Sequence, residues 1–499
     1  MNFAISHTRS SIGLHARPID VEVHLSNGLP AFTIVGLPET AVRESKDRVR
    51  SAIMNSHFEF PCRKITVNLA PATIPKIGSG FDLPIALGIL AASGQIPAHK
   101  LSSHEFFAEL ALDGHLRGVS GIIPVILATH DAEHQVIIAR ANAPEASMTG
   151  HAHVHLADHL LAVCQYLSHD HPLDSISEPP KTLRTDDDLD WSEIKGQHHA
   201  KMALEVAACG GHSLLLNGPP GSGKTMLAKR FSTLLPELTE KQALESAAIY
   251  SMRSHREHFE NWRQPPYRAP HHTASHVALV GGGNPPKPGE ISLAHHGILF
   301  LDELPEFHRH VLETLREPME SGQICISRAA IQIDFPARFQ LIAAMNPCPC
   351  GQSGNPNATC RCTPDQITRY VGKISAPLLD RIDLHVHVQT LSHAELLQPS
   401  GTKQQESLRI RERVVQARAI QMTRQGRLNA DLSVNECEHV CALGDSERQF
   451  LQTVLEKFKL SARAYFRLLK VARTIADQDA HPHVTVLQLQ QALSFKSML

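Results

Sequence analysis

The strongest chemical signal in this 499-residue sequence is a glycine-rich run between an apolar stretch at 214–216 and a helix-like stretch at 226–235. The run fits the pattern G-x4-G-K-[ST] and consists of Gly218, Pro219, Pro220, Gly221, Ser222, Gly223, Lys224 and Thr225. Glycines let successive backbone N–H groups converge on phosphate oxygens, and the N-terminus of the following helix attracts negative charge. The pattern therefore predicts a nucleotide site in which Lys224 binds the β- and γ-phosphates and the Thr225 hydroxyl binds Mg²⁺.

An acidic pair, Asp302 and Glu303, follows four apolar residues at 298–301. Four consecutive apolar residues predict a buried strand of a parallel sheet, and such sheets bind ligands at the carboxyl ends of their strands. We expect Asp302 to hold Mg²⁺ and Glu303 to act as general base on the attacking water. The alternative is an ordinary acidic pair at a strand end.

Two further side chains could act on the same phosphates. Asn346 ends a third apolar run and could hydrogen-bond the γ-phosphate or the water, although an Asn-Pro pair also commonly starts a turn. Arg381 precedes a predicted strand, so it could reach the γ-phosphate of a neighbouring subunit. The alternative for Arg381 is a salt bridge to Asp380 or Asp383.

Four of the ten cysteines form two C-x-C pairs: Cys348, Cys350, Cys360 and Cys362. Four thiolates can close a tetrahedral, structural Zn²⁺ site, which would stabilise the polar loop between the pairs. The alternatives are free or redox-active thiols and an iron–sulfur cluster. Zinc is favoured over disulfides if the compartment is reducing.

The sequence also indicates the compartment, which we expect to be reducing. The N-terminus has no apolar segment of signal-peptide length, and no apolar run approaches the roughly 18 residues that span a membrane. We therefore expect a soluble, cytoplasmic protein. The net charge is −2, so any affinity for nucleic acid must come from local patches or a channel.

Periodicity divides the chain into four parts, and the first is an α/β domain at 1–165. Its expected elements are a hairpin, a helix, a strand and a second helix, at 19–36, 39–56, 64–72 and 81–94. The hairpin turn is expected at Asn27-Gly28.

The remaining parts carry the residues described above. A polar, proline-containing linker at 166–190 leads into an α/β core at 191–395, which contains the cysteine-rich insertion at 345–365. From 396 to 499 the pattern is helical.

Longer stretches around these motifs resemble the AAA+ ATPases, and within them the magnesium-chelatase-like ComM/YifB family. The stretches are IVGLPETAVRESKDRVRSAI, NLAPATIPKIGSGFDLPIALGILAASG, RAPHHTASHVALVGGG, GEISLAHHGILFLDELPEF, PARFQLIAAMNPCPCG and LSARAYFRLLKVARTIAD. The resemblance covers nearly the whole chain. It implies an AAA+ P-loop core with a C-terminal helical lid, which binds ATP and Mg²⁺ and forms a homohexameric ring.

The resemblance also assigns roles. Asn346 resembles the sensor 1 residue, Arg381 the arginine finger, and Arg463 the sensor 2 arginine of the lid. The alternative for Arg463 is a solvated helix face.

The first domain resembles the proteolytic domain of Lon, a ribosomal-S5-like fold. Gly80 stands where the Lon serine is expected, and Ile123 stands where the lysine is expected. Ser79 is one residue away from the serine position. A Ser–Lys dyad needs both groups, so we expect this domain to be inactive as a protease.

The family association implies an ATP-dependent DNA helicase or translocase that promotes branch migration during natural transformation, with single-stranded and branched DNA as partners. Arg328, in the predicted hairpin at 322–339, could contact phosphate, and 263–289 resembles a second pore loop. The basic stretch 408–427 has six arginines, and its alternative is a solvated face. The rival functions are a protein- or metal-remodelling motor like the magnesium chelatase ATPase subunit, and an ATP-dependent protease.

Overall fold

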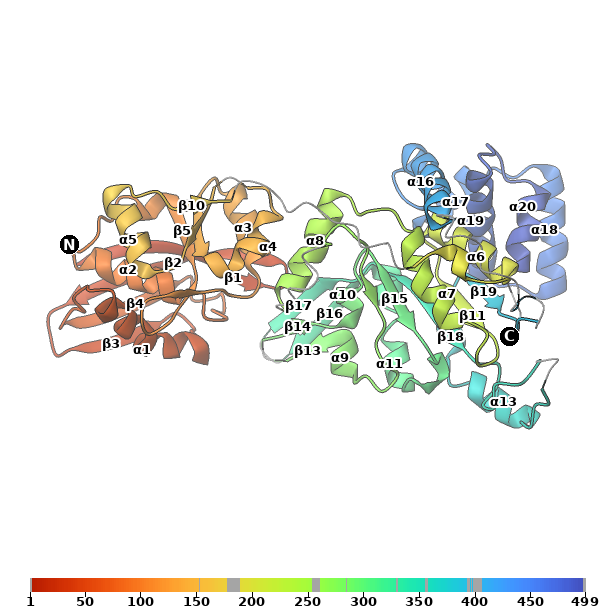
Figure 1. Ribbon diagram of the computed structural model, residues 1–499, viewed down its shortest axis with the longest axis horizontal. Helices are drawn as coiled ribbons and strands as arrows, with labels where there is room; N and C mark the ends of the chain where they lie inside the picture. The colour runs from red at the N-terminus through yellow and green to blue at the C-terminus, as the bar shows by residue number, and fades with distance from the viewer. Residues whose placement is uncertain are drawn as a thin grey trace.

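The protein is an elongated molecule with three consecutive parts, as the computed structural model in Figure 1 shows. The first domain lies at one end, the core with the phosphate loop lies in the middle, and the C-terminal helices lie at the other end. The structure describes residues 2–151, 153–176, 189–253, 261–283, 285–328, 331–354, 358–392, 395, 397 and 406–496. The side chains of Arg328 and Ile331 lie outside this description.

The first domain is built on an eight-stranded mixed sheet, in the order β10-β9-β8-β5-β1-β2-β4-β3. Its strands are β1 (Phe3–Ile12), β2 (His15–Ser26), β3 (Ala31–Val35), β4 (Lys64–Ala70), β5 (His104–Phe107), β8 (Gln135–Ala139), β9 (Val154–Ala157) and β10 (Asp174–Ser175). The hairpin predicted over 19–36 is wrong. The chain does turn between β2 and β3, but β4 inserts between them, antiparallel to β2 and parallel to β3. The strand that forms a hairpin with β2 is β1, through a tight turn after Ile12.

The first two helices of this domain confirm the helices predicted at 39–56 and 81–94. The helices of the domain are α1 (Thr40–Asn55), α2 (Asp82–Ala92), α3 (Ile122–Asp131), α4 (Ala143–Ser147) and α5 (Leu160–His169). Every residue of α2 is buried, which explains its apolar sequence. Helix α5 continues past residue 165 and β10 lies beyond it, so we place the end of this domain near Ile176.

The core contains a five-stranded parallel sheet in the order β12-β15-β18-β11-β19. Its strands are β11 (Leu214–Asn217), β12 (Tyr267–Arg268), β15 (Ile298–Leu301), β18 (Gln340–Met345) and β19 (Leu384–His387). Its helices include α6 (His198–Gly210), α7 (Lys224–Phe231), α8 (Glu240–Ser251), α9 (His276–Val280), α10 (Glu290–Leu293), α11 (Arg309–Glu313), α12 (Pro318–Ser321), α13 (Pro364–Val371) and α14 (Ala376–Leu379). The strands at 298–301 and 340–345 are buried throughout, which confirms the parallel-sheet prediction for both apolar runs.

Two short hairpins lie beside each other at the side of the core that faces the first domain (Figure 1). They pair β13 (Gly281–Gly282) with β14 (Lys287–Pro288), and β16 (Gln323–Arg328) with β17 (Ile331–Pro336). A Cβ on Gly281 would stand 2.7 Å from Cδ1 of Ile326, so the hairpins are in close contact. The second hairpin confirms the strand prediction for 322–339.

The first domain packs directly on the core. The N–H of Gly121, at the start of α3, donates to the carbonyl of Ser251 in α8 at 3.0 Å. Ile122 and Ile126 share one buried apolar cluster with Ala247 and Tyr250 of the core. The β1–β2 turn also touches the second hairpin, because a Cβ on Gly13 would lie 2.7 Å from Cγ2 of Ile333.

The C-terminal region is helical, as predicted, with α16 (Glu406–Gln425), α17 (Val434–Cys441), α18 (Asp445–Phe458), α19 (Ala462–Gln478) and α20 (Val486–Ser494). Five of the six arginines at 408–427 contact protein groups. They are Arg411 on Thr233, Arg413 on Glu205, Arg418 on Ala208, Arg424 on Asp477 and Arg427 near Glu436. The arginines of this stretch therefore mainly connect α16 to the core and to the rest of the C-terminal helical region.

Candidate nucleotide-binding site

The phosphate loop leaves β11 at Asn217 and enters α7 at Lys224. Gly221 and Gly223 have φ values of +75° and +92°, which favour glycine and turn the loop back toward the helix. A Cβ on Gly218 would stand 2.2 Å from the carbonyl oxygen of Val388, so this position also requires glycine. The loop conformation thus depends on its glycines at both ends.

Lys224 points back into the loop. Its Nζ donates to the carbonyls of Gly218 and Pro219 at 2.7 and 2.9 Å, and to Oδ1 of Asn346 at 3.1 Å. Burial lowers the pKa of Lys224, and the charges of Asp302 and Glu303 counteract this change. The contact with Asn346 brings together two residues that lie 122 positions apart in sequence.

The sheet order explains this arrangement. Because β18 lies between β11 and β15, the residues that follow these three strands converge at one edge of the sheet. The Thr225 hydroxyl donates to Oδ2 of Asp302 at 2.6 Å. A hydroxyl and a carboxylate oxygen side by side are suitable ligands for Mg²⁺, which retains water and phosphate oxygens as its other ligands.

Glu303 has a partner that sequence reasoning did not assign. Oε2 of Glu303 lies 3.1 Å from Nδ1 of His272, whose ring also packs on His271 and, edge-on, near Phe307. Glu303 has a φ of +54°, an uncommon conformation for a residue with a Cβ. The only sequence signal for His272 was its place in the segment 263–289, which resembles a pore loop.

Arg381 and Arg463 meet on one acidic residue, Glu320 of α12. An Nη2 atom of each arginine contacts Oε1 of Glu320, at 2.7 Å from Arg381 and 2.5 Å from Arg463. The predicted alternative for Arg381 was an ion pair with Asp380 or Asp383. Because Arg381 pairs with Glu320 instead, this alternative is wrong. The sequence offered no signal for Glu320.

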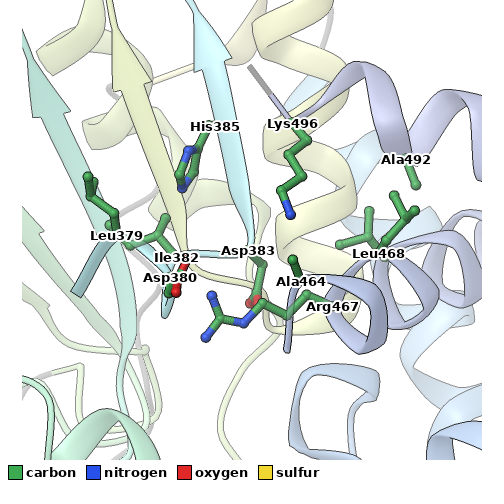
Figure 2. A pocket seen from close by; sticks show the side chains of 11 residues that line it. Leu379, Asp380, Ile382, Asp383, His385, Ala464, Arg467, Leu468, Ala492 and Lys496 are labelled. Carbon is green, nitrogen blue, oxygen red and sulfur yellow. The ribbon is translucent and has the colours of Figure 1, made fainter. Parts of the chain in front are cut away.

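Asp383 belongs instead to the joint between core and lid. It lies 3.5 Å from Nε of Arg467 and 3.4 Å from Nδ1 of His212. Burial would raise the pKa of Asp383, but the hydrogen bond and charge of His212 and the charge of Arg467 outweigh it, so the pKa falls. Figure 2 shows the Arg467 guanidinium reaching from α19 toward Asp380 and Asp383, beside a small cavity also lined by Lys496.

The cysteine-rich insertion brings its thiols together. The Sγ atom of Cys348 lies 3.4 Å from that of Cys350 and 3.7 Å from that of Cys360, and Cys362 completes the set within 4.8 Å. Four sulfurs bound to one Zn²⁺ at about 2.3 Å in a tetrahedron would stand roughly 3.8 Å apart. The residues therefore fit a structural Zn²⁺.

A second group of metal-ligand types, Glu245, His295 and His296, does not fit a metal. Nδ1 of His295 accepts a hydrogen bond from the Arg338 backbone N–H at 3.0 Å, so the proton of the neutral ring is on Nε2. That Nε2 faces Glu245 at 3.5 Å, and Nε2 of His296 lies 2.7 Å from the same carboxylate oxygen. A metal-bound histidine donates through its other nitrogen, which His295 cannot do here.

The protease-like positions have apolar surroundings. A Cβ on Gly80 would stand 2.6 Å from the ring of Phe107, and Ile123 is fully buried in the cluster between first domain and core. A serine at 80 would collide with this ring. This geometry supports the expectation that the domain lacks a Ser–Lys dyad.

The predicted DNA-contacting residues are only partly described. Arg328 ends β16, but its side chain lies outside the described residues. Arg268, in the other candidate pore segment, makes a bidentate pair with Glu290 at 2.7 and 2.9 Å. Arg268 is therefore engaged within the core.

Family models match the chain in three segments. The model described as "Magnesium chelatase, subunit ChlI" matches residues 190–396, "Subunit ChlI of Mg-chelatase" matches 21–142, and "Magnesium chelatase, subunit ChlI C-terminal" matches 404–496. Together with the parallel sheet, the phosphate loop and the helical C-terminal region, these matches define a magnesium-chelatase-like AAA+ protein, a class that indicates ATPase activity.

Similar known proteins identify the family of this chain more closely. Competence protein ComM of Haemophilus influenzae is 51% identical over 504 residues, covering 100% of this chain and 98% of ComM. YifB of Escherichia coli is 49% identical over 499 residues, with the same coverage. The chloroplastic magnesium-chelatase subunit ChlI of Oryza sativa subsp. indica is 33% identical over 119 residues, which is 24% of this chain and 23% of ChlI. The chain belongs to the ComM/YifB family of magnesium-chelatase-like AAA+ proteins.

None of the helices in the described part of the chain is long and apolar enough to cross a membrane.

Proposed function

We propose that this protein is an ATP-dependent, hexameric DNA helicase or translocase that promotes branch migration during recombination of transforming DNA. The observation that carries the ATPase part is the convergence of Lys224, Asn346 and the Thr225–Asp302 pair at one sheet edge. The DNA part rests on full-length similarity to Competence protein ComM. We expect the protein to act in the cytoplasm.

The positions of these side chains support the hydrolysis of ATP. Lys224 and the loop N–H groups bind the phosphates and stabilise the charge that develops on their oxygens. Glu303 takes a proton from the attacking water, and Asn346 orients that water or the γ-phosphate. Thr225 and Asp302 would hold Mg²⁺, which neutralises charge on the β- and γ-phosphates.

Completion of the site by a second subunit is part of the proposal. Arg381 would act as arginine finger and Arg463 as sensor 2, so hydrolysis would depend on ring assembly. In a hexamer, six copies of the two hairpins, with Arg328 at the end of β16, would contact one DNA strand. Such multiplicity allows a nearly neutral protein to bind DNA with a strong salt dependence.

A structural Zn²⁺ is the proposed metal of the cysteine insertion, held by Cys348, Cys350, Cys360 and Cys362. The first domain is proposed to serve assembly or partner binding, because its contact with α8 and the second hairpin fixes it to the motor.

The test is the ATPase rate of the wild type and of Glu303→Gln, with and without single-stranded and forked DNA, at two salt concentrations. We expect several-fold stimulation by DNA that weakens at high salt and is absent in the variant. Strand-displacement assays on forked DNA then measure translocation. A robust rate that ignores every DNA would overturn the DNA motor.

A second candidate, a protein- or metal-remodelling motor, is favoured by the ChlI models that match all three segments. Its ATPase would be indifferent to DNA and would respond to a protein partner. The other rival function, an ATP-dependent protease, is disfavoured by Gly80 and Ile123 at the dyad positions, and a casein digestion assay tests it directly.

A further inference from the structure

We propose that Glu320 is a positioning residue that holds Arg381 and Arg463 as a pair for the nucleotide of a neighbouring subunit. The inference rests on the proposed roles of these two arginines. Its basis is that three segments far apart in sequence bring one carboxylate and two guanidiniums together.

The first observation is which edge of the sheet the group occupies. The strands are parallel, with Leu214 opposite Leu384 and Asn217 opposite His387. The phosphate loop follows β11, whereas Arg381 precedes β19. The two therefore lie at opposite edges, separated by the length of a four-residue strand, about 13 Å. Arg381 thus lies at the edge of the sheet opposite its own nucleotide site.

The second observation is how Arg381 is held. Its side chain is only 9% exposed, and its Nη1 donates to the carbonyl of Pro377 at 2.7 Å while Nη2 contacts Glu320. Nε is buried without a hydrogen-bond partner. The guanidinium is therefore fixed at two of its three nitrogens, and Glu320 is its charged partner.

The third observation is that Arg463 comes from a different domain. It lies in the first turn of α19 in the lid, and its side chain is 48% exposed, as is that of Glu320. Both arginines contact the same oxygen, Oε1, so neither can be moved without affecting the other. Glu320 thereby fixes the lid relative to the core at the surface that would face a neighbour.

Charge explains why an acid is needed. Two guanidiniums that share one oxygen would repel each other without it. Burial would raise the pKa of Glu320, but the hydrogen bond and charge of Arg381 and the charges of Arg463 and Arg316 outweigh this, so the pKa falls. The carboxylate is ionised at neutral pH, and the group keeps a net positive charge for a γ-phosphate.

The test compares Glu320→Gln with a matched control, Glu313→Gln. Glu313 is a nearby acid that pairs with Arg316 at 2.7 Å and contacts neither Arg381 nor Arg463. With assembly verified by light scattering, we expect Glu320→Gln to lower kcat about tenfold with KM for ATP changed by less than about twofold, because the arginines act on the transition state. Glu313→Gln should keep the wild-type rate. An unchanged thermal midpoint excludes misfolding as the cause.

Two further measurements locate the effect. In an Arg463→Ala background, Glu320→Gln should add little, because both changes disrupt one unit. In mixed rings, Glu303→Gln subunits should supply arginines to Arg381→Ala subunits and restore hydrolysis. When the Glu303→Gln subunits also carry Glu320→Gln, the restored rate of hydrolysis should be several-fold lower.

The possible outcomes distinguish the positioning role of Glu320 from the proposed function. A normal kcat for Glu320→Gln, or an effect fully additive with Arg463→Ala, overturns the positioning role while the proposed function stands. Normal rates for Arg381→Ala and Arg463→Ala overturn both the arginine roles and this inference. Persistence of hydrolysis in Glu303→Gln contradicts the proposed active site itself.

Discussion

The backbone of Gly351, in the cysteine-rich insertion, lies directly against Pro220 of the phosphate loop. A Cβ atom on Gly351 would stand 2.5 Å from Cδ and 2.7 Å from Cγ of the proline ring. Gly351 immediately follows Cys350, so the cluster of four thiols borders the nucleotide site of its own subunit. This contact gives the insertion a physical route by which it could influence nucleotide binding.

Substitution of Gly351 by alanine should weaken nucleotide binding several-fold. The added methyl group would push against the Pro220 ring and shift the phosphate loop. Gly354 provides a matched control, because it has nearly the same φ, +73° against +74°, but no atom of the described residues lies within 4 Å of its Cβ position. Both alanine variants carry similar backbone strain, of about 1–2 kcal/mol. Titration with a fluorescent ATP analogue measures the difference, and equal affinities would contradict a role for the contact.

The purified chain should contain about one zinc ion, held by the four clustered thiols. Replacement of Cys350 or Cys362 by serine should remove most of this metal and lower the thermal midpoint of unfolding, because the loop loses its ligand. Cys62 is an exposed thiol in the first domain and serves as the control, since Cys62→Ser should leave the zinc content unchanged. Atomic absorption provides the readout. Iron with visible absorbance in place of zinc would indicate a cluster, and absence of metal would indicate free thiols.

His272→Ala should lower kcat for ATP hydrolysis by roughly three- to tenfold with little change in nucleotide affinity, because the contact orients Glu303 as general base. His271 is the neighbouring control. It packs on His272, but its Nδ1 contacts the hydroxyl of Thr273 and not Glu303. Steady-state rates and nucleotide titrations on both variants distinguish the two effects. A defect of equal size in both would show that the local loop matters and not the contact with Glu303.

Stability should decline below pH 6.5 through His295. Burial, followed by the charge of His296, lowers the pKa of His295 to about 3, against an opposing effect of Glu245. His295 therefore binds a proton less readily in the folded state than in the unfolded chain. The free energy of unfolding is not reduced by His295 above pH 6.5. As the pH falls from 6.5 toward 3, it decreases by up to about 1.4 kcal/mol per pH unit.

His295→Asn tests this effect, because its side-chain oxygen can still accept from the Arg338 N–H while it cannot titrate. Thermal midpoints at pH 7.5 and 5.5 should fall less in the variant than in the wild type. Burial also lowers the pKa of the buried His104 and of the half-buried His155, so the comparison concerns the difference between the two proteins. An identical decline in both would show that His295 does not titrate as described.

The linear sequence was sufficient for features that depend on neighbouring residues. The phosphate loop, the acidic pair after 298–301 and the apolar helix at 81–94 were predicted because their chemistry or periodicity lies within one short stretch. The predicted hairpin at 19–36 failed because strand pairing is not local. The turn at Asn27-Gly28 exists, but the partner strand β4 comes from 64–70.

The sequence by itself determined the chemical inventory: a phosphate-binding loop, an acidic pair, two candidate arginines and four cysteines in two C-x-C pairs. Only the tertiary structure decided which of them meet. The order of five parallel strands brings Asn346 to Lys224 and Asp302 to Thr225, and it places Arg381 at the opposite edge. The contacts made by Glu320, His272 and Pro220 could not be predicted from sequence because they arise from packing between distant segments, which no local pattern encodes.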